Sequence, residues 1–194
     1  MSGNTRQQQR WDERYARANP VTSAAACEVL RLNQHLLPEQ GSALDLACGL
    51  GGNALLLAER GLQVTASDIS AVGLQVLATA AEASGLTITT QHRDIEQQGL
   101  GSEQFDVICV SRYLHRPICA HITSALKLGG LLFYQTFCEE KDDGVGPNNA
   151  EFVLRTNELL SLFENLTLRY YRESGRLGDR QPGHRHEALF IGQR

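Results

Sequence analysis

The sequence predicts an α/β fold, in which helices cover both faces of a doubly wound, mostly parallel sheet. Through residues 42–137, short apolar segments of strand character alternate with segments of helical periodicity. The first of these strands runs straight into a glycine-rich turn, which is typical of the ligand-binding edge of a parallel sheet. Two strand-like segments close the chain with no helix between them, so the final pair is expected to be antiparallel.

The elements are predicted in chain order from periodicity and from the residues that begin or end helices. After a polar N-terminal arm, apolar residues recur at helical spacing between Pro20 and Pro38, which predicts a helix before the sheet. The strands predicted next are 42–47, 62–68, 86–91, 105–110 and 131–137. The helices predicted between them are 53–60, 70–83 and 117–126.

The last quarter departs from this alternation. Thr156 is expected to cap a helix over 157–166. Strands are then expected over 167–173 and 186–192, joined by the loop 174–185. Because this loop lacks helical periodicity, it cannot supply a helical crossover, and an antiparallel hairpin is predicted.

Length and composition favour one domain and a small-molecule site. A chain of 194 residues fits a single core, which we divide into an N-terminal part (1–38), a ligand-binding core (42–137) and a final part (138–194). The net charge of −4 does not suit a broad nucleic-acid footprint, so no nucleic-acid partner is expected. No apolar run reaches the roughly 18 residues of a membrane span, which predicts a soluble protein without a membrane partner.

The five cysteines are odd in number and widely spaced, without a C-x-x-C pair. This pattern indicates neither a disulfide framework nor a zinc site, so we expect a cytoplasmic protein without a bound metal. The sequence leaves the oligomeric state open between a monomer and a weak dimer.

The turn after the first predicted strand carries the ligand-binding signal. Gly49 and Gly51 can adopt positive φ and let a ligand approach the main chain, and a helix near Asn53 offers free amides to an anionic group. Asp68 ends the second strand, where a carboxylate can accept both hydroxyls of a ribose. The spacing Gly49-x-Gly51-x-x-Ala54 also satisfies a loose dinucleotide fingerprint, so an NAD(P)-dependent oxidoreductase stays an alternative.

Three features favour a nucleoside that carries an amino acid over a dinucleotide. Asp45 lies in the first strand, four residues before Gly49, where an acid can face a cationic amino group. Asp94 ends the third strand, where its carboxylate can accept from an adenine amine beside the amide of Ile95. The terminal hairpin replaces the second mononucleotide-binding half that a dinucleotide needs.

With these residues the chain resembles the class I S-adenosylmethionine-dependent methyltransferases, and in particular the small bacterial tellurite-resistance-like members. The resemblance runs through WDERY, LDLACGLGGNA, VTASDIS, RDIE, FDVICVSRYLH and LKLGGLLFYQTF. It implies a Rossmann-like, seven-stranded sheet with the last strand antiparallel. It also implies S-adenosylmethionine as cofactor and S-adenosylhomocysteine as product. The cofactor-binding residues that it implies are Trp11, Arg14, Tyr15, Asp45, Ala47, Gly49, Gly51, Asn53, Asp68, Ile69, Asp94, Ile95, Ser111 and Arg112.

The resemblance assigns a role to each group of positions. Gly49 and Gly51 would cradle the methionine part, and the main chain of Ser111 and Arg112 would close over the cofactor near the methyl group. Ala47 stands where the family often has glycine. In WDERY, an N-terminal lid would use Arg14 or Tyr15 to reach the cofactor carboxylate, and the alternative is an amphipathic helix whose Trp11 packs on the sheet.

The acceptor is predicted less sharply than the cofactor. Methyl transfer is an in-line displacement that depends mainly on alignment, so the lack of an obvious catalytic dyad does not count against it. Enzymes that methylate nucleobase amines commonly carry an Asn or Asp, two prolines and an aromatic residue after the fourth strand. This chain lacks that motif there, so a nucleobase acceptor is less favoured. Arg112, His115 and Arg116 lie at this edge instead, where they could position a small anionic acceptor. They could form an anion pocket with Arg176, Arg180, His184 and Arg185, or all could be solvated loop charges.

The sequence therefore predicts methyl transfer to a small, possibly anionic molecule. Besides the oxidoreductase, the remaining alternative is a non-catalytic cofactor-binding protein.

Overall fold

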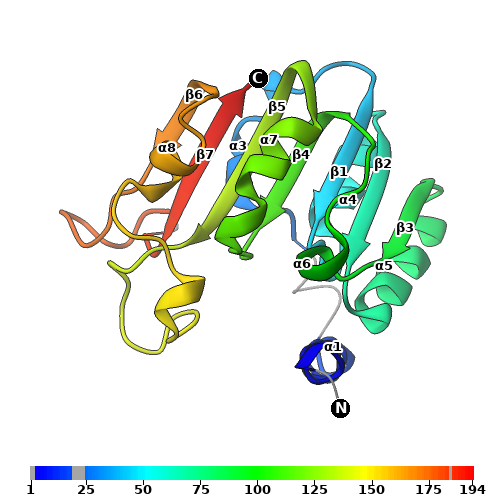
Figure 1. Ribbon diagram of the computed structural model, residues 1–194, viewed down its shortest axis with the longest axis horizontal. Helices are drawn as coiled ribbons and strands as arrows, with labels where there is room; N and C mark the ends of the chain where they lie inside the picture. Colours follow the sequence, from blue (N-terminus) through cyan, green and yellow to red (C-terminus); the bar gives the residue numbers. More distant parts are fainter. Residues whose placement is uncertain (1–2, 19–24, 184) are drawn as a thin grey trace.

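A seven-stranded sheet with the order β3-β2-β1-β4-β5-β7-β6 forms the centre of the molecule (Figure 1). The computed structural model describes residues 3–18, 25–183 and 185–194. Neighbouring strands are parallel except that β7 is antiparallel to both β5 and β6, so the predicted fold class is confirmed. The strands are β1 (Ser42–Leu46), β2 (Gln63–Asp68), β3 (Ile88–His92), β4 (Phe105–Ser111), β5 (Leu126–Phe137), β6 (Thr167–Arg172) and β7 (Glu187–Gln193).

The strand order reverses between β1 and β4. From β1 the chain moves outward to β2 and β3, and β4 then returns to the other side of β1. The loops that leave the carboxyl ends of β1 and β4 therefore separate to opposite sides and leave room for a ligand. The turn at 47–51 and the segment after Ser111 meet at this edge.

Helices cover both faces, as predicted, because each apolar face of the sheet must be buried. The helices α3, α4 and α5 pack on one face, and α6, α7 and α8 pack on the other. In Figure 1, α7 and α8 lie in front of the sheet and α3 lies behind it. The helices are α1 (Gly3–Ala16), α3 (Glu28–Leu32), α4 (Gly52–Glu59), α5 (Ala71–Ala83), α6 (Ile95–Gln98), α7 (Cys119–Ala125) and α8 (Glu158–Leu162), with 3-10 turns η1 (Gln34–Leu36), η2 (Arg116–Ile118) and η3 (Ala150–Phe152).

The long helix predicted before the sheet is wrong where the structure describes it. Only α3 and η1 are helical there, and residues 20–24 of the prediction lie outside the described residues. The break falls at Asn33, whose side chain donates to the Val29 carbonyl over 2.9 Å. This side chain takes the place of a helical amide at the end of α3, so the apolar spacing alone predicted too long a helix.

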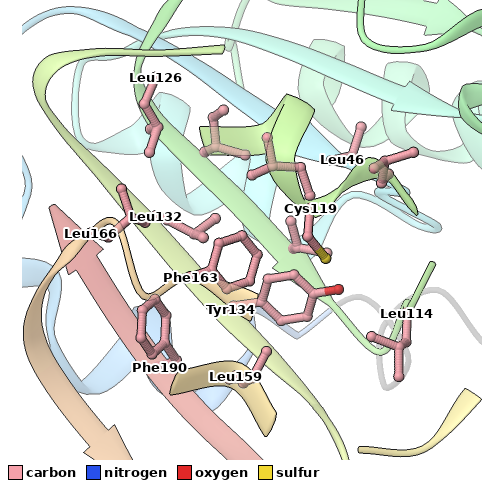
Figure 2. Packing of buried hydrophobic residues seen from close by; sticks show 14 of the residues in the cluster. Leu46, Leu114, Cys119, Leu126, Leu132, Tyr134, Leu159, Phe163, Leu166 and Phe190 are labelled. Atoms are coloured by element: carbon pink, nitrogen blue, oxygen red, sulfur yellow. The ribbon is translucent and has the colours of Figure 1, made fainter. Parts of the chain in front are cut away.

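The helix predicted from a Thr156 cap is also wrong in its start and length. The helix α8 begins after Asn157, which adopts a left-handed φ of 61°, while Thr156 donates its amide to Glu139 over 3.1 Å. Phe163 comes just after α8, where its ring packs against Tyr134 and Phe190 with centroid distances of 5.5 and 5.6 Å (Figure 2). Aromatic packing therefore holds this segment, rather than a long helix.

The terminal hairpin is confirmed, because β6 and β7 pair antiparallel with a register shift near Leu168. The helix α1 lies under the carboxyl ends of the parallel strands in Figure 1 and contacts α5. None of the helices in the described ranges is long and apolar enough to cross a membrane.

Candidate cofactor and acceptor site

The turn after β1 has the left-handed backbone that its glycines predict. Gly49 and Gly51 have φ of 57° and 81°, and Ala47 also has a positive φ of 54°. A left-handed conformation costs an L residue roughly 1–2 kcal/mol, which explains why glycine would suit the position of Ala47. A Cβ on Gly51 would lie 2.3 Å from Leu77, so α5 packs directly against this turn.

Asp68 at the end of β2 fixes the turn from the other side. Its two carboxylate oxygens accept from the amides of Gly49 and Ser70, each over 2.8 Å. The side chain is buried, and this burial raises the pKa of Asp68 from its usual range. Ile69 follows, with its carbonyl 2.9 Å from His92 Nε2. The predicted ribose-binding residue thus also holds the turn after β1 and the start of α5 in place.

A second buried carboxylate connects β1 to α4 and β4. Asp45 is 0% exposed and accepts from the Asn53 side chain over 3.3 Å and from the Ala54 amide over 3.0 Å. Burial raises the pKa of Asp45 to about 7. Asn53 also donates to Ser111 Oγ over 3.0 Å and accepts from the Cys27 amide over 2.8 Å. The structure brings three predicted residues together here.

Tyr15 of α1 rests on the turn. A Cβ on Gly49 would lie 2.9 Å from the Tyr15 hydroxyl oxygen, and a Cβ on Gly73 would lie 3.0 Å from the Tyr15 ring. Desolvation raises the pKa of Tyr15, and the nearby Asp68 raises it further. The predicted N-terminal helix therefore places this side chain against the turn after β1, and its role as a lid stays a prediction.

The rest of α1 is held by a contact that the sequence did not single out. Asp12 accepts from Ser70 Oγ over 2.5 Å and from the Val72 amide over 3.4 Å at the start of α5. Trp11 stacks on Tyr15 with ring centroids 5.4 Å apart, and the Arg14 guanidinium lies 5.2 Å from the Trp11 ring centroid. Tyr15 thus reaches the turn, and Arg14 packs on Trp11.

Asp94 is the N-cap residue of α6. One carboxylate oxygen, Oδ1, accepts from the amides of Glu96 and Gln97 over 3.0 and 3.3 Å. The other, Oδ2, is buried and has no hydrogen-bond partner within the described ranges. An acceptor without a partner costs free energy unless a ligand supplies a donor, so this atom suits an exocyclic amine. Ile95, beside it, is buried.

Arg112 follows β4 with a positive φ of 53°. Its Nε donates to Glu187 Oε1 over 2.9 Å, and its guanidinium carbon lies 6.0 Å from the Phe137 ring centroid. Its side chain is 57% exposed, whereas that of Glu187 is 3% exposed. The two terminal nitrogens of Arg112 have no hydrogen-bond partner among the residues that the structure describes.

Arg116 has the opposite environment. Its Nε and Nη2 donate to the two oxygens of Glu158 over 2.7 and 2.8 Å. Its Nη1 and Nη2 also donate to the carbonyls of Glu151 and Val153 over 2.8 and 2.9 Å. These contacts tie η2 to the segment 150–158, and the role of Arg116 toward an acceptor stays a prediction.

His115, which follows β4, has its Nδ1 3.9 Å from Glu96 on α6.

The loops beyond β5 and β6 contact each other. The arginines of the loop 174–185 contact the segment 139–143 or their own loop, so their pocket stays a prediction. These contacts join Arg176 to the Lys141 carbonyl, Arg180 to the Asp142 carboxylate and Arg185 to the Ser174 carbonyl.

Comparisons with known proteins relate this chain to methyltransferases. Residues 43–130 match the family model described as a methyltransferase domain. A ubiquinone biosynthesis O-methyltransferase from Stutzerimonas stutzeri is 30% identical over 155 residues, covering 75% of this chain and 66% of the relative. The chain belongs to the class I S-adenosylmethionine-dependent methyltransferases. Across three curated relatives of the same name, the matched part spans 44–66% of their length.

Solved methyltransferase structures agree on the fold. TehB from Haemophilus influenzae superposes with a TM-score of 0.70 at 22% identity, covering 88% of this chain and 63% of that one. A TehB-like methyltransferase from Corynebacterium glutamicum has a TM-score of 0.63 at 18% identity, covering 98% and 97%. The resemblance to tellurite-resistance-like methyltransferases is thus confirmed at the level of the fold.

The residues of this methyltransferase fit its cofactor. The unpartnered Asp94 Oδ2 can accept from the adenine amine. Gly49 and Gly51 give the turn after β1 a left-handed main chain without Cβ atoms, and Tyr15 lies against it. A groove of about 730 Å³ lies at the opposite edge of the sheet, lined by residues such as Gln63 and Glu103, and contains none of the predicted site residues.

The side chains that bind metals in other proteins are spread through the described part of the chain. No group of three or more His, Cys, Asp or Glu side chains is placed there to hold an ion. The Cys27 and Cys109 sulfurs lie 3.9 Å apart, and His186 faces Asp142 over 3.8 Å. His184, which the anion-pocket prediction included, lies outside the described residues.

Several polar residues around the site were not predicted from the sequence. They act across large sequence separations, and a polar residue at a strand end carries no signal of its partner. Glu187 could have been noticed as an acid at the start of an otherwise apolar strand, and Asp12 as an acid between Trp11 and Tyr15. The residues missed are Asp12, Ser70, Gln135, Glu158 and Glu187.

Proposed function

We propose that this methyltransferase moves a methyl group from S-adenosylmethionine to a small anionic acceptor, with S-adenosylhomocysteine as the other product. The observation that supports the anionic acceptor is Arg112, whose terminal nitrogens are unpartnered in the described structure while its Nε is held by Glu187. A guanidinium presented in this way can bind two oxygens of a planar anion at once.

For the cofactor, we propose that the turn of Gly49 and Gly51 approaches the methionine part and that Asp68 accepts from the ribose. Asp94 and Ile95 would bind the adenine edge, and Tyr15 would reach the carboxylate. Asp45, buried under the turn, would favour the cationic amino group. When bound, S-adenosylmethionine supplies an electrophilic methyl group on a positively charged sulfur.

The chain's own contribution to the chemistry is alignment and the exclusion of water. Arg112 orients the acceptor, and the covering helix α1 closes the crevice over the turn. Correct placement of reactants can lower a barrier by ~7–11 kcal/mol. An acceptor that is already ionised at its nucleophilic atom needs no general base. His115, 29% exposed near Glu96, is the proposed proton acceptor for a neutral one.

An oxygen nucleophile is the first acceptor class to test, because the curated relatives are O-methyltransferases by name. A carboxylated catechol, 3,4-dihydroxybenzoate, carries both the hydroxyl and the planar anion. Catechol itself lacks the anion and is the matched control. A chalcogen oxyanion such as selenite is the second class, suggested by the TehB-like fold.

The test has two stages. Calorimetric titration should show binding of S-adenosylmethionine and S-adenosylhomocysteine, and binding of NAD alone would instead support the oxidoreductase alternative. Release of S-adenosylhomocysteine is then measured with each acceptor. Arg112→Ala should raise KM for the anionic acceptor about tenfold while cofactor affinity is unchanged. Cofactor binding without turnover of any acceptor would favour a non-catalytic protein.

The place of action and the assembly state are part of the same proposal. A cytoplasmic location is proposed from the odd number and wide spacing of the cysteines. A monomer or weak dimer is proposed for the assembly, which light scattering measures directly.

A further inference from the structure

We infer that Glu187 is a positioning residue that aims the Arg112 guanidinium at the methyl acceptor. This inference rests on the proposed function, because it concerns the same acceptor site. Glu187 stands at the start of β7 and is 3% exposed, although it carries a charge. A buried carboxylate is costly unless each oxygen has a donor, so its partners indicate what it does.

The two oxygens of Glu187 have different donors. Oε1 accepts from Arg112 Nε over 2.9 Å, and Oε2 accepts from Gln135 Nε2. The Gln135 amide is itself fixed, since its Oε1 accepts from the Val29 amide over 2.8 Å. The chain of contacts therefore runs from the first turn of α3 through β5 to β7 and ends at the guanidinium of Arg112. Neither Gln135 nor Glu187 can turn without breaking a buried hydrogen bond.

Arg112 is fixed on its other sides as well. Its amide donates to the Gln135 carbonyl over 2.7 Å, and its backbone is left-handed. Phe137, which is the β5 residue paired with Glu187 on β7, has its ring centroid 6.0 Å from the guanidinium carbon. Binding a ligand normally costs free energy because a long arginine side chain loses conformational entropy. The contacts with Glu187, Gln135 and Phe137 reduce this cost because they restrict Arg112 before the acceptor binds.

The pairing also determines what Arg112 can recognise. Because the Glu187 charge compensates that of Arg112, attraction for an anion comes from two directed N–H donors rather than from net charge. The structure thus favours planar anions with two oxygens, such as carboxylates, over spherical anions of the same charge. Binding should also depend weakly on salt concentration.

A matched pair elsewhere in the chain supplies the control. Glu158 binds Arg116, but there the carboxylate takes both Nε and Nη2, and backbone carbonyls take the remaining edge. Arg116 therefore presents no comparable fork to a ligand. Glu187 leaves the terminal nitrogens of its arginine available, and Glu158 does not.

The test is Glu187→Gln, which keeps the shape but exchanges one acceptor oxygen for a donor NH2. Since Arg112 Nε and Gln135 Nε2 both donate to this residue, one of them then faces another donor. The Kd of 3,4-dihydroxybenzoate for the protein saturated with S-adenosylhomocysteine should rise about tenfold, as should its KM. The kcat, the Kd of S-adenosylmethionine and the affinity for catechol should stay within about twofold.

Two further variants separate the outcomes. Glu158→Gln should lower Tm without changing the acceptor Kd, and Arg112→Ala combined with Glu187→Gln should be no worse than Arg112→Ala alone. If Arg112→Ala raises the acceptor Kd and Glu187→Gln does not, the inference about Glu187 is wrong and the proposed function stands. If wild type binds 3,4-dihydroxybenzoate no better than catechol, the inference about Glu187 is wrong, and the proposed function is then tested with the second acceptor class, selenite. A parallel loss of cofactor affinity in Glu187→Gln would show a merely structural role and also overturn the inference.

Discussion

The loops at the carboxyl ends of the parallel strands form two halves, which are held by different kinds of contact. At the ends of β1 and β2, carboxylates accept from main-chain amides nearby in sequence, with separations of 9 residues for Asp45 with Ala54 and 19 for Asp68 with Gly49. At the end of β4 and the start of β7, side chains pair with side chains, and the separation from Arg112 to Glu187 is 75 residues. The half at β1 and β2, which we propose binds the cofactor (the cofactor half), is thus fixed through main-chain groups. The half around Arg112, which we propose binds the acceptor (the acceptor half), is fixed by pairs of side chains.

This difference indicates which half tolerates substitutions as related proteins diverge. A substitution in the cofactor half disturbs the turn itself, because the side chains there hold main-chain groups. A substitution in the acceptor half replaces one ion pair and leaves the strands in place. Variants that act on one half alone test this difference.

The largest effect is expected for Gly51→Ala in the cofactor half. The new Cβ would meet Leu77 at 2.3 Å and also impose a left-handed φ of 81° on alanine. Strain and overpacking together should lower the free energy of unfolding by about 2–5 kcal/mol, measured by urea denaturation. Gly129→Ala is the control, since its φ is 83° with nothing within 4 Å, so about 1–2 kcal/mol is expected. Equal losses in both variants would refute the packing argument.

Asp68→Ala should weaken S-adenosylmethionine binding about 10–100-fold. It removes the carboxylate that we propose accepts from the ribose hydroxyls, and it leaves the Gly49 and Ser70 amides without their partner. Isothermal calorimetry gives the Kd. Asp106→Ala is the control, because this acid pairs with Lys127 at the opposite edge and should leave the Kd unchanged. An unchanged Kd in Asp68→Ala would contradict the ribose assignment.

In the acceptor half, Arg116→Ala should lower the free energy of unfolding by about 1–2 kcal/mol. The residue is partly exposed, but it makes two contacts to Glu158 and two to carbonyls, which anchor the segment 150–158. Arg180→Ala removes a more exposed pair with Asp142 and should cost about 0–1 kcal/mol. Chemical denaturation of both variants compares them, and a larger loss for Arg180→Ala would reverse the ranking.

The smallest effect is a pH dependence of cofactor affinity in the cofactor half. Burial raises the pKa of Asp45 to about 7, so the free protein keeps this carboxyl largely protonated below that pH. A raised folded pKa means that its contribution to folding is greatest at low pH and is lost as pH rises toward 7.

Because a cationic amino group favours the ionised form, S-adenosylmethionine affinity should rise about fivefold to tenfold from pH 6 to pH 8 and then level off. Calorimetry in two buffers of different ionisation enthalpy measures the released proton. Asp45→Asn should flatten the curve, and a curve that stays steep in that variant would assign the proton to another group.

Much of the fold follows from local patterns in the sequence. The parallel strands and the positive φ at Gly49 and Gly51 follow from short periodicities or single residues. The predicted cofactor positions also meet in the structure, since Asp45, Asn53 and Ser111 share hydrogen bonds.

The errors and omissions have a common physical cause. The helix ends at Asn33 and Asn157 are set by one side-chain contact and one left-handed residue, which apolar spacing does not encode. The partners of Arg112 and Arg116 come from strands and helices far along the chain, so the sequence could not tell a presented guanidinium from an anchored one.

The contact between Tyr15 and Gly49 has a kinetic consequence. We expect a ligand that approaches this turn to displace the ring and the Asp12 contact beside it before Tyr15 closes over it again. If uptake begins with departure of α1, its rate constant at saturating ligand should level off at the opening rate rather than climb with concentration. A stopped-flow record that stays linear to high concentration would mean that the arm never closes the entrance.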